Sequence, residues 1–490
     1  MKSEADFEIL IDRYHQGEAT KVEIEQLNAL LRSDDQALRK FIALMNLDSA
    51  LAALVTDHHA LSVADDDPEP APLIPARKRP VSGWQILCAV CLVFLVAGAW
   101  WSFLPQPIFA TVVSCVGVDH LTNETKLRDE WQKISTGTLE LITANQARLV
   151  IEAPANFRFK SAQSLYLYRG RLAAEIPPSA KRFTVMTPSG NAIDLGTKFG
   201  VDVPLQGETE IHVFQGEVVA QSSGGGKQKN LYNGDAFRLQ AGSGGSRPLR
   251  SGAFIRPSEV ASLHAAIIAG QQANSESVLA QLRDDPALIM LLDFESPSNA
   301  EGKYQVVQGR WPGSQAPEFV DMEDHIKLDV GGEHDWPQLT LAAWVRIDQL
   351  TAPYQSLLHS NGREGDQRGQ VHWMVTNQKT VQLGISGNVA QGPDKKQPQA
   401  DSQFMPGRWM HLALVYDADR KVVGFFVNGQ IDEEVQLKVA QPAVLGSAII
   451  GNWKAADRKL SGRIDEMLIL GRAMNNAEIK KLFDAGNPYR

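Results

Sequence analysis

The chain has 490 residues, which is too long for one ordinary domain and suggests about three. Its 43% hydrophobic and 21% charged residues are typical of globular protein, and its formal net charge of −9 argues against a nucleic-acid-binding protein, which normally carries a basic face. Three cysteines are too few for a disulfide framework.

Residues 1–60 have the pattern of three short helices. Between Phe7 and Tyr14 the apolar residues follow the i, i+3, i+4, i+7 spacing of a helix face. So small a bundle buries little surface, so its apolar faces either bind a partner or pack against one another. Residues 61–83 are acidic, then proline-rich, then basic, and are predicted to be a tether.

Residues 84–104 are predicted to be a transmembrane helix. They contain no charged residue, and twenty-one residues of helix span about 31 Å, close to the thickness of the hydrocarbon core. Arg77, Lys78 and Arg79 precede the segment, so the positive-inside rule places the N-terminus in the cytoplasm. The pair Cys88 and Cys91 lies within this apolar run and is interpreted as lipid-compatible rather than as a redox or zinc pair.

The rest of the chain is predicted to be mainly β. Residues 105–127 have the pattern of a linker with some β character, and residues 128–250 alternate short β-type runs with glycine turns. Residues 257–283 return to a helical composition and are predicted to be a spacer. Residues 286–490 are again β-rich and end with a short helix. The predicted fold class is therefore mainly β and multidomain, with a small N-terminal α-helical bundle and one transmembrane helix.

Three short motifs lie within residues 128–250. They are Thr187-Pro188-Ser189-Gly190, Asp194-Leu195-Gly196-Thr197-Lys198-Phe199, and Val213 to Val218 around Gly216, with Gly234-Asp235 after them. This set resembles the FecR-type periplasmic domain over about 110 residues. The glycines allow tight turns, and we expect Asp194, Leu195, Gly196, Thr197, Phe199 and Gly216 to have mainly structural roles.

The resemblance to FecR implies a layout and a function. Proteins of that family sit in the bacterial inner membrane behind a short cytoplasmic helical region, and they relay an outside signal to an extracytoplasmic-function sigma factor. The order predicted above, with cytoplasmic helices, tether, single span and periplasmic β domain, is the layout of that family.

Residues 286–490 resemble a LamG-like jelly roll of the concanavalin A-like lectin/glucanase superfamily. The resemblance is carried by residues 339–348, 407–430 and 460–483, in the order of that family. Within the second segment, Asn428-Gly429 predicts a type I′ β-hairpin because both turn positions require positive φ. The resemblance implies a β-sandwich that binds carbohydrate or protein and that in some members holds calcium.

Aromatic residues near predicted loops or strand ends are the candidate ligand platforms, because sugar rings stack on exposed aromatic rings. These candidates are Trp336, His372, Trp373 and Trp453. Burial in the core is the alternative for each of them. Asp329, Asp465 and Glu466 are weaker candidates for calcium ligands, and Asp465 has a structural turn role as its alternative.

No catalytic constellation is found in the sequence. A retaining glucanase needs two carboxylates about 5–5.5 Å apart, and no strand of the chain carries the matching pattern of acidic residues. G-x-S-x-G, H-E-x-x-H and phosphate-loop motifs are also missing. The sequence predicts no enzyme and no cofactor, with calcium left open.

The sequence therefore predicts a single-pass inner-membrane regulator of FecR type. Its cytoplasmic residues would contact a sigma factor or related regulator, and its periplasmic lectin-like domain would bind a glycan or a protein. The alternative is a membrane-anchored carbohydrate-binding or scaffolding protein without a signalling role.

Overall fold

The computed structural model describes residues 107–205, 208–223, 228–240, 243–295, 301–330, 332–362, 365–390, 405–453 and 458–489. The predicted N-terminal bundle, tether and transmembrane helix lie outside these residues. Within them, none of the helices combines the length and the apolar character that a membrane crossing needs.

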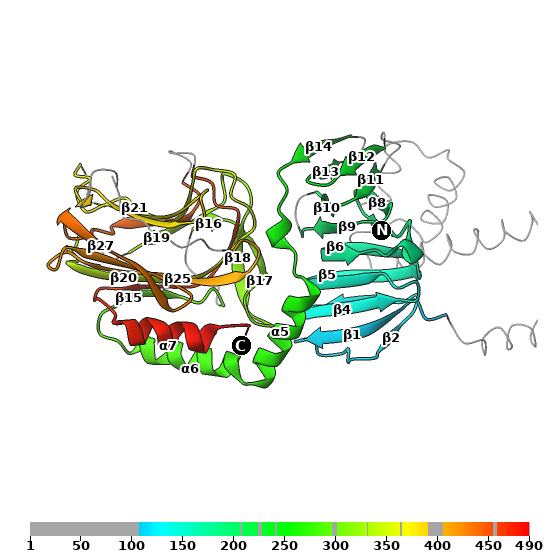
Figure 1. Cartoon of the computed structure of the whole chain (residues 1–490), viewed down its shortest axis with the longest axis horizontal. Helices are drawn as coiled ribbons and strands as arrows, with labels where there is room; N and C mark the ends of the chain where they lie inside the picture. The colour runs from blue at the N-terminus through cyan, green and yellow to red at the C-terminus, as the bar shows by residue number, and fades with distance from the viewer. Residues whose placement is uncertain are drawn as a thin grey trace, which may run out of the picture. The chain divides into compact units, whose positions relative to one another are not determined.

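The first module, residues 107–247, is built on one sheet whose strand pairs are antiparallel with one exception (Figure 1). Its strands are β1 (Ala110–Val116), β2 (Lys126–Leu127), β3 (Trp131–Ile134), β4 (Thr138–Thr143), β5 (Arg148–Ser161), β6 (Ser164–Glu175), β7 (Thr184–Thr187), β8 (Gly190–Asp194), β9 (Lys198–Val203), β10 (Glu210–Gln215), β11 (Glu217–Ser222), β12 (Lys229–Tyr232), β13 (Ala236–Gln240) and β14 (Ser243–Arg247). The pairing of β6 with β7 is parallel. Strands β1 and β2 belong to this sheet, so part of the predicted linker 105–127 is part of the module.

Two helices follow, in the range predicted to be helical. They are α5 (Pro257–Ile268) and α6 (Gln271–Arg283). They are packed elements rather than a free spacer. Val260 and Leu263 of α5 share a buried apolar cluster with Val116 and Val150 of the first module. Leu279 and Leu282 of α6 pack against the second module.

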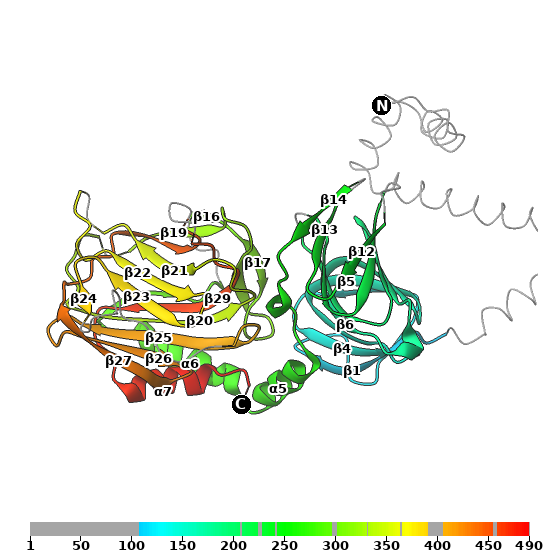
Figure 2. The same ribbon diagram turned by 45° about the horizontal axis from the view of Figure 1, so that its top comes forward.

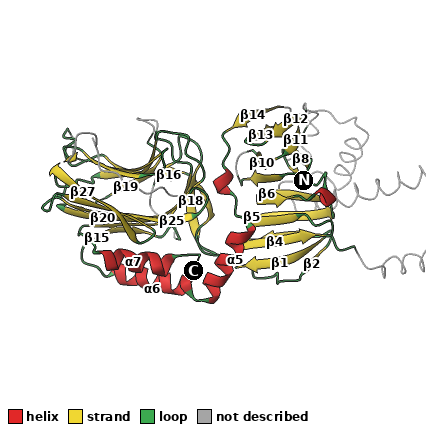
Figure 3. Ribbon diagram, viewed as in Figure 1, coloured by secondary structure: helices red, strands yellow, loops and turns green. Residues whose placement is uncertain are grey.

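The second module is a β-sandwich closed by a C-terminal helix. One sheet contains β15 (Leu288–Leu292), β17 (Gln305–Gln308), β18 (Gln315–Phe319), β20 (Gln338–Ile347), β24 (Val389–Ala390), β25 (Trp409–Asp417), β26 (Val422–Val427), β27 (Gln430–Val439) and β29 (Gly462–Leu470). The other contains β16 (Gly302–Lys303), β19 (His325–Asp329), β21 (Tyr354–Ser360), β22 (Val371–Thr376), β23 (Val381–Ile385) and β28 (Ser447–Gly451). Figure 2 shows the two sheets facing each other, and α7 (Asn476–Gly486) lies beside α6 in Figure 3.

The sandwich confirms the jelly-roll prediction in its details. Side chains from both sheets alternate inward and form one continuous apolar core. The Asn428-Gly429 turn joins β26 to β27 with φ of +50° and +74°, as a type I′ turn requires. The mainly β fold class is therefore confirmed for the described residues.

The two modules share an interface of buried charges. Arg171 of β6 donates to Asp202 of β9 at 2.7 Å and to Glu318 of the second module at 2.9 Å. Arg463 of β29 binds Glu318 at 3.4 Å and forms a two-pronged pair with Glu152 of β5. Each of these residues is at most 8% exposed.

The connecting segment adds a third arginine to the interface. Arg250 donates to Asp202 at 2.9 Å, to Glu210 at 3.3 Å and to Asp348 at 3.2 Å, and it lies 3.7 Å from Glu318. Burial would raise the pKa of Glu318, but the guanidinium groups of Arg171, Arg463 and Arg250 lower it to about 2. The carboxylate is therefore charged at neutral pH and holds arginines from all three segments of the chain. We call these three arginines, with Glu152, Asp202, Glu210, Glu318 and Asp348, the interface ion network.

Candidate functional site

The FecR-type motif forms a locked turn after β8. The Asp194 carboxylate accepts hydrogen bonds from the Gly196 amide at 2.8 Å and from the Thr197 hydroxyl. Gly216 packs so closely against this turn that an added Cβ would lie 2.6 Å from Thr197 Cγ2. The carboxylate is fully buried, and burial raises its pKa.

The remaining motif residues have packing roles. Phe199 is fully buried in the core of the first module, and Leu195 lies within the turn with partial exposure. Each carboxylate oxygen of Asp194 therefore accepts a hydrogen bond from within the turn, and the structural role of the motif stays a prediction.

The structure brings together two of the four predicted platform residues, His372 and Trp453. His372 lies on β22, and its ring centroid is 5.0 Å from that of Trp453, with the rings nearly perpendicular. A third ring, His359 of β21, lies opposite His372 in the strand pair. Its centroid is 4.3 Å from that of His372 and 3.8 Å from that of Trp453.

Arg458 extends this aromatic group along the six-stranded sheet. Its Nη1 donates to His372 Nδ1 at 2.8 Å, and its guanidinium carbon lies 4.7 Å from the Trp453 ring centroid and 5.7 Å from that of Tyr354. Tyr354 is 42% exposed, whereas Trp453 and Arg458 are half-buried. We call His359, His372, Trp453, Arg458 and Tyr354 the aromatic platform.

The polar atoms of the platform are incompletely paired. Within the described part of the chain, both ring nitrogens of His359 and Nε2 of His372 have no hydrogen-bond partner. Burial and the nearby positive groups lower the pKa of His359 to about 4 and that of His372 to about 3, so both rings are neutral at pH 7. His359 is only 2% exposed and packs against the Trp453 ring, so the surface open to a ligand is formed by Trp453, Tyr354 and the partly exposed edge of His372. Ring surface beside one guanidinium suits stacking with a sugar ring or an aromatic side chain.

The other two platform candidates lie elsewhere. Trp373 points into the sandwich core and is fully buried, so it is a packing residue and is unavailable to a ligand. Trp336 is half-buried, packs against the core and against His334, and bridges Ala443 through its backbone. Trp373 and Trp336 therefore take the alternative role considered for them, which is packing in or against the core.

The calcium candidates are not brought together. Asp329 ends β19 in one sheet, whereas Asp465 and Glu466 lie on β29 in the other. Asp465 accepts from the Arg310 backbone amide at 2.8 Å, and Glu466 forms an ion pair with the Arg310 side chain at 2.6 Å. Among the described residues, no group of three or more His, Cys, Asp or Glu side chains is placed to hold a metal.

Sequence reasoning missed His359, Tyr354 and Arg458. A β-bulge between Ser356 and Leu358 places two successive leucines in the core and so breaks the alternation of β21. If the side chains of β21 alternated strictly from Tyr354, His359 would face the core. Because of the bulge it faces away from the core, beside His372. Arg458 reaches the rings because its backbone bridges that of Trp453.

Each of the two modules matches the model of a known protein family. Residues 123–219 match the family model of FecR protein. Residues 322–480 match the model of the concanavalin A-like lectin/glucanases superfamily. The sequence-based resemblance of each module is thereby confirmed, and the chain contains a FecR-type module followed by a lectin-like sandwich.

No curated protein matches the chain, and the three solved structures that follow share a distant likeness with it. The botulinum neurotoxin serotype D binding domain is 11% identical, with a TM-score of 0.33, and the match covers 40% of this chain and 50% of that one. Domain 4 of a Geobacillus stearothermophilus arabinanase, in complex with arabinotriose, is 18% identical over 37% of this chain and 82% of its own, with a TM-score of 0.29. A Limulus polyphemus SAP-like pentraxin is 14% identical over 34% and 80%, with a TM-score of 0.27.

Because the histidines of the aromatic platform are buried, we predict that the unfolding free energy of the protein decreases at acidic pH. Because the folded-state pKa of His359 lies below its ordinary value of 6.5, its contribution to stability is complete above pH 6.5 and decreases as the pH falls toward 4. A His359→Phe variant keeps a ring against Trp453 but cannot be protonated. Between pH 7 and pH 5 the wild type should lose about 2 kcal/mol more unfolding free energy than this variant, measured by urea denaturation. Equal losses in the two proteins would contradict the assigned environment of His359.

Proposed function

We propose that the chain is a single-pass regulator of FecR type in the bacterial inner membrane. In this proposal residues 1–60 lie in the cytoplasm and contact an extracytoplasmic-function sigma factor, and residues 84–104 cross the membrane. The FecR-type module and the sandwich lie in the periplasm. The match to FecR and the uncharged segment 84–104 with its basic N-terminal flank support this topology.

The observation that favours signalling over simple anchoring is the interface ion network. A domain that only displays a binding site needs no more than a flexible connection to its anchor. Here Arg171, Arg250 and Arg463 tie the sandwich to the FecR-type module through buried carboxylates. A load or a structural change produced by a ligand on the sandwich would therefore reach the FecR-type module and, through β1, the chain that precedes it.

The proposed ligand of the sandwich is a glycan or a protein that docks on the aromatic platform. Trp453 and Tyr354 offer ring surface, and Arg458 offers a cation held between them. Both matched families are mainly families without catalytic activity, although the second includes glucanases, and we propose no catalytic step for this chain.

Co-purification of a sigma factor is the test of the regulatory role. Tagged full-length protein should retain one sigma factor from a membrane extract of the host. A chain lacking residues 1–60 should retain none, because the proposal assigns the contact to the apolar faces of the helices predicted for that segment. The measurement is mass spectrometry of the bound fraction. Failure of the full-length protein to retain a sigma factor above the level of the deletion control would refute the regulatory proposal.

The alternative function is that of an anchored lectin or scaffold. Glycan-array binding by the full-length protein tests the platform in either case. A Trp453→Ala variant should bind about five- to thirtyfold more weakly, because stacking on the Trp453 ring contributes on the order of 1–2 kcal/mol. The matched control is Trp131→Ala, which removes a half-exposed tryptophan from the other module and should leave binding unchanged. Glycan binding without a retained sigma factor would favour the anchored lectin.

A further inference from the structure

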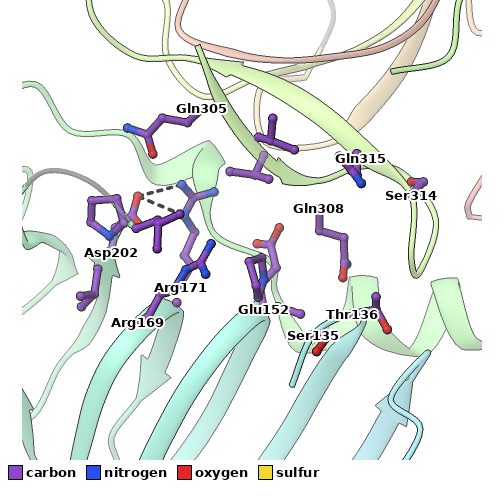
Figure 4. A pocket seen from close by; sticks show the side chains of 18 of the residues that line it. Ser135, Thr136, Glu152, Arg169, Arg171, Asp202, Gln305, Gln308, Ser314 and Gln315 are labelled. Atoms are coloured by element: carbon purple, nitrogen blue, oxygen red, sulfur yellow. Dashed lines mark hydrogen bonds and ion pairs between the residues drawn. The ribbon is translucent and has the colours of Figure 1, made fainter. Parts of the chain in front are cut away.

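Strands β5 and β6 of the FecR-type module change partners partway along their length. Their mutual register shifts between Glu152 and Asn156. On one side of this shift they pair with β4 and β9, and on the other side they pair with β3 and β7. The first of these two faces is covered, because Glu152 and Arg171 are directed toward the sandwich (Figure 4) and α5 packs on Val150. The second face is built differently.

The described residues leave this second face open. Along β3 the exposed Trp131 and Lys133 alternate with two buried side chains, as expected for a strand with one side on the core. Trp131 is 50% exposed and Tyr168 of β6 is 55% exposed. We call six outward side chains of these three strands the basic-aromatic face: Trp131, Lys133, Arg158, Lys160, Tyr166 and Tyr168.

Three of these side chains form a row across the strands. Trp131 lies opposite Arg158 in the β3–β5 pair, and Arg158 lies opposite Tyr166 in the β5–β6 pair. The ring centroids of Trp131 and Tyr166 are 5.8 Å apart with the rings perpendicular. The face therefore offers two amphipathic rings with a cation between them.

The basic-aromatic face has an excess of positive charge. Three of its six side chains are basic, and Asp129 neutralises one charge through its ion pair with Arg158. Lys133 forms no ion pair within the described part of the chain. The exposed neighbours of Asp129 in the chain, Arg128 and Glu130, balance each other. The net charge of this surface is thus positive, although the whole chain is acidic.

The chain enters the module close to this face. The Phe109 amide donates to the Leu127 carbonyl at 2.9 Å, and Trp131 follows Leu127 by four residues, which span at most about 14 Å. From Leu104, the last residue of the proposed transmembrane helix, the chain to Ala110 in β1 reaches at most about 20 Å. If residues 84–104 cross the membrane, this end of the module stays next to the lipid headgroups.

We propose that the basic-aromatic face docks the FecR-type module on the anionic lipid surface beside the transmembrane helix. This inference rests on the membrane anchoring in the proposed function. Tryptophan and tyrosine rings are favoured at the membrane–water interface, and lysine and arginine near an anionic surface add electrostatic attraction. Docking fixes the orientation of the module at the membrane, which a free tether does not.

The connection to the transmembrane helix favours lipid over a protein as the occupant of the face. A soluble protein has to be recruited, whereas the lipid surface is held next to the face by the chain itself. Docking is consequently intramolecular, and a surface of few residues is sufficient because the effective concentration of lipid is high.

The test is fluorescence quenching in full-length protein embedded in lipid nanodiscs. The three native cysteines are replaced by alanine, and one fluorophore is attached at Met186→Cys, which lies beside Tyr166 in the β6–β7 pair, or at Ala265→Cys, which is exposed on α5. The discs contain lipid with a nitroxide on its headgroup, which quenches at short range. In phosphatidylglycerol discs, quenching at position 186 should be at least twofold stronger than at position 265. It should decrease in phosphatidylcholine discs and at high salt.

Variants of the face test which side chains hold the lipid. Lys133→Gln together with Lys160→Gln should lower the docking equilibrium constant about thirtyfold, from two factors of about five. The matched control is Lys421→Gln together with Lys438→Gln, which removes two exposed lysines from the sandwich and should have no effect. Trp131→Ala should weaken docking in both lipids. Thermal denaturation of each variant checks that it is folded.

Co-elution of the protein with the disc lipid separates this proposal from the proposed function. A chain that does not co-elute refutes the membrane anchoring, and the docking with it. A chain that co-elutes but is quenched equally at the two labels, or equally in the two lipids, refutes the docking alone and leaves the face to a protein partner. The docking is also refuted if the Lys133 and Lys160 variant is quenched like its parent, or if the control pair loses as much quenching.

Discussion

The buried carboxylate of Glu318 is the constraint on which the arrangement of the described chain depends. It lies on β18 of the sandwich, yet its partners come from β6 of the FecR-type module, from the connecting segment and from β29. Charges this deeply buried are tolerated only while they are paired, because an unpaired buried ion costs several kcal/mol. Sliding or rotating one module against the other would separate these pairs. The network therefore holds the modules in one arrangement.

The interface ion network also bears on the proposed role of the aromatic platform. The platform lies on the six-stranded sheet of the sandwich, whereas β18 and β29, which carry Glu318 and Arg463, belong to the other sheet. In the proposed function, a ligand on the platform would act on the FecR-type module through the core of the sandwich and the buried ion pairs.

Structural features that depend on a few neighbouring residues were predicted from the sequence. The Asn428-Gly429 hairpin and the helical character of residues 257–283 follow from turn chemistry and composition, and the structure confirms them. The jelly roll was predicted from a family resemblance carried by three segments in the family order, and the match of residues 322–480 to the superfamily supports it. The structural role of Asp194 and Thr197 was also predictable, because their hydrogen bonds close within three residues.

Contacts between residues that are far apart in the sequence could not be predicted from local patterns. Arg463 and Glu152 are separated by 311 positions, and in the sequence each is an ordinary charged residue of a strand. His359 was missed because a bulge changes which face it occupies, and Trp373 was misplaced because β22 turns that ring into the core. Residues 257–283 were interpreted as a spacer because their weak amphipathic pattern does not show that α5 packs against both modules and that α6 packs against the sandwich.

Hydrogen exchange of a Glu318→Gln variant tests the central claim most directly. Glu301→Gln is the matched control, because that side chain is 81% exposed and lies 3.6 Å from Lys327 on the surface. The account predicts that Glu318→Gln lowers the protection of amides in both β6 and β20 by about 3 kcal/mol, because three buried arginines lose a charged partner. The control should lower neither. A loss confined to the sandwich, or no difference between the two variants, would contradict the conclusion that the ion network makes the two modules one unit.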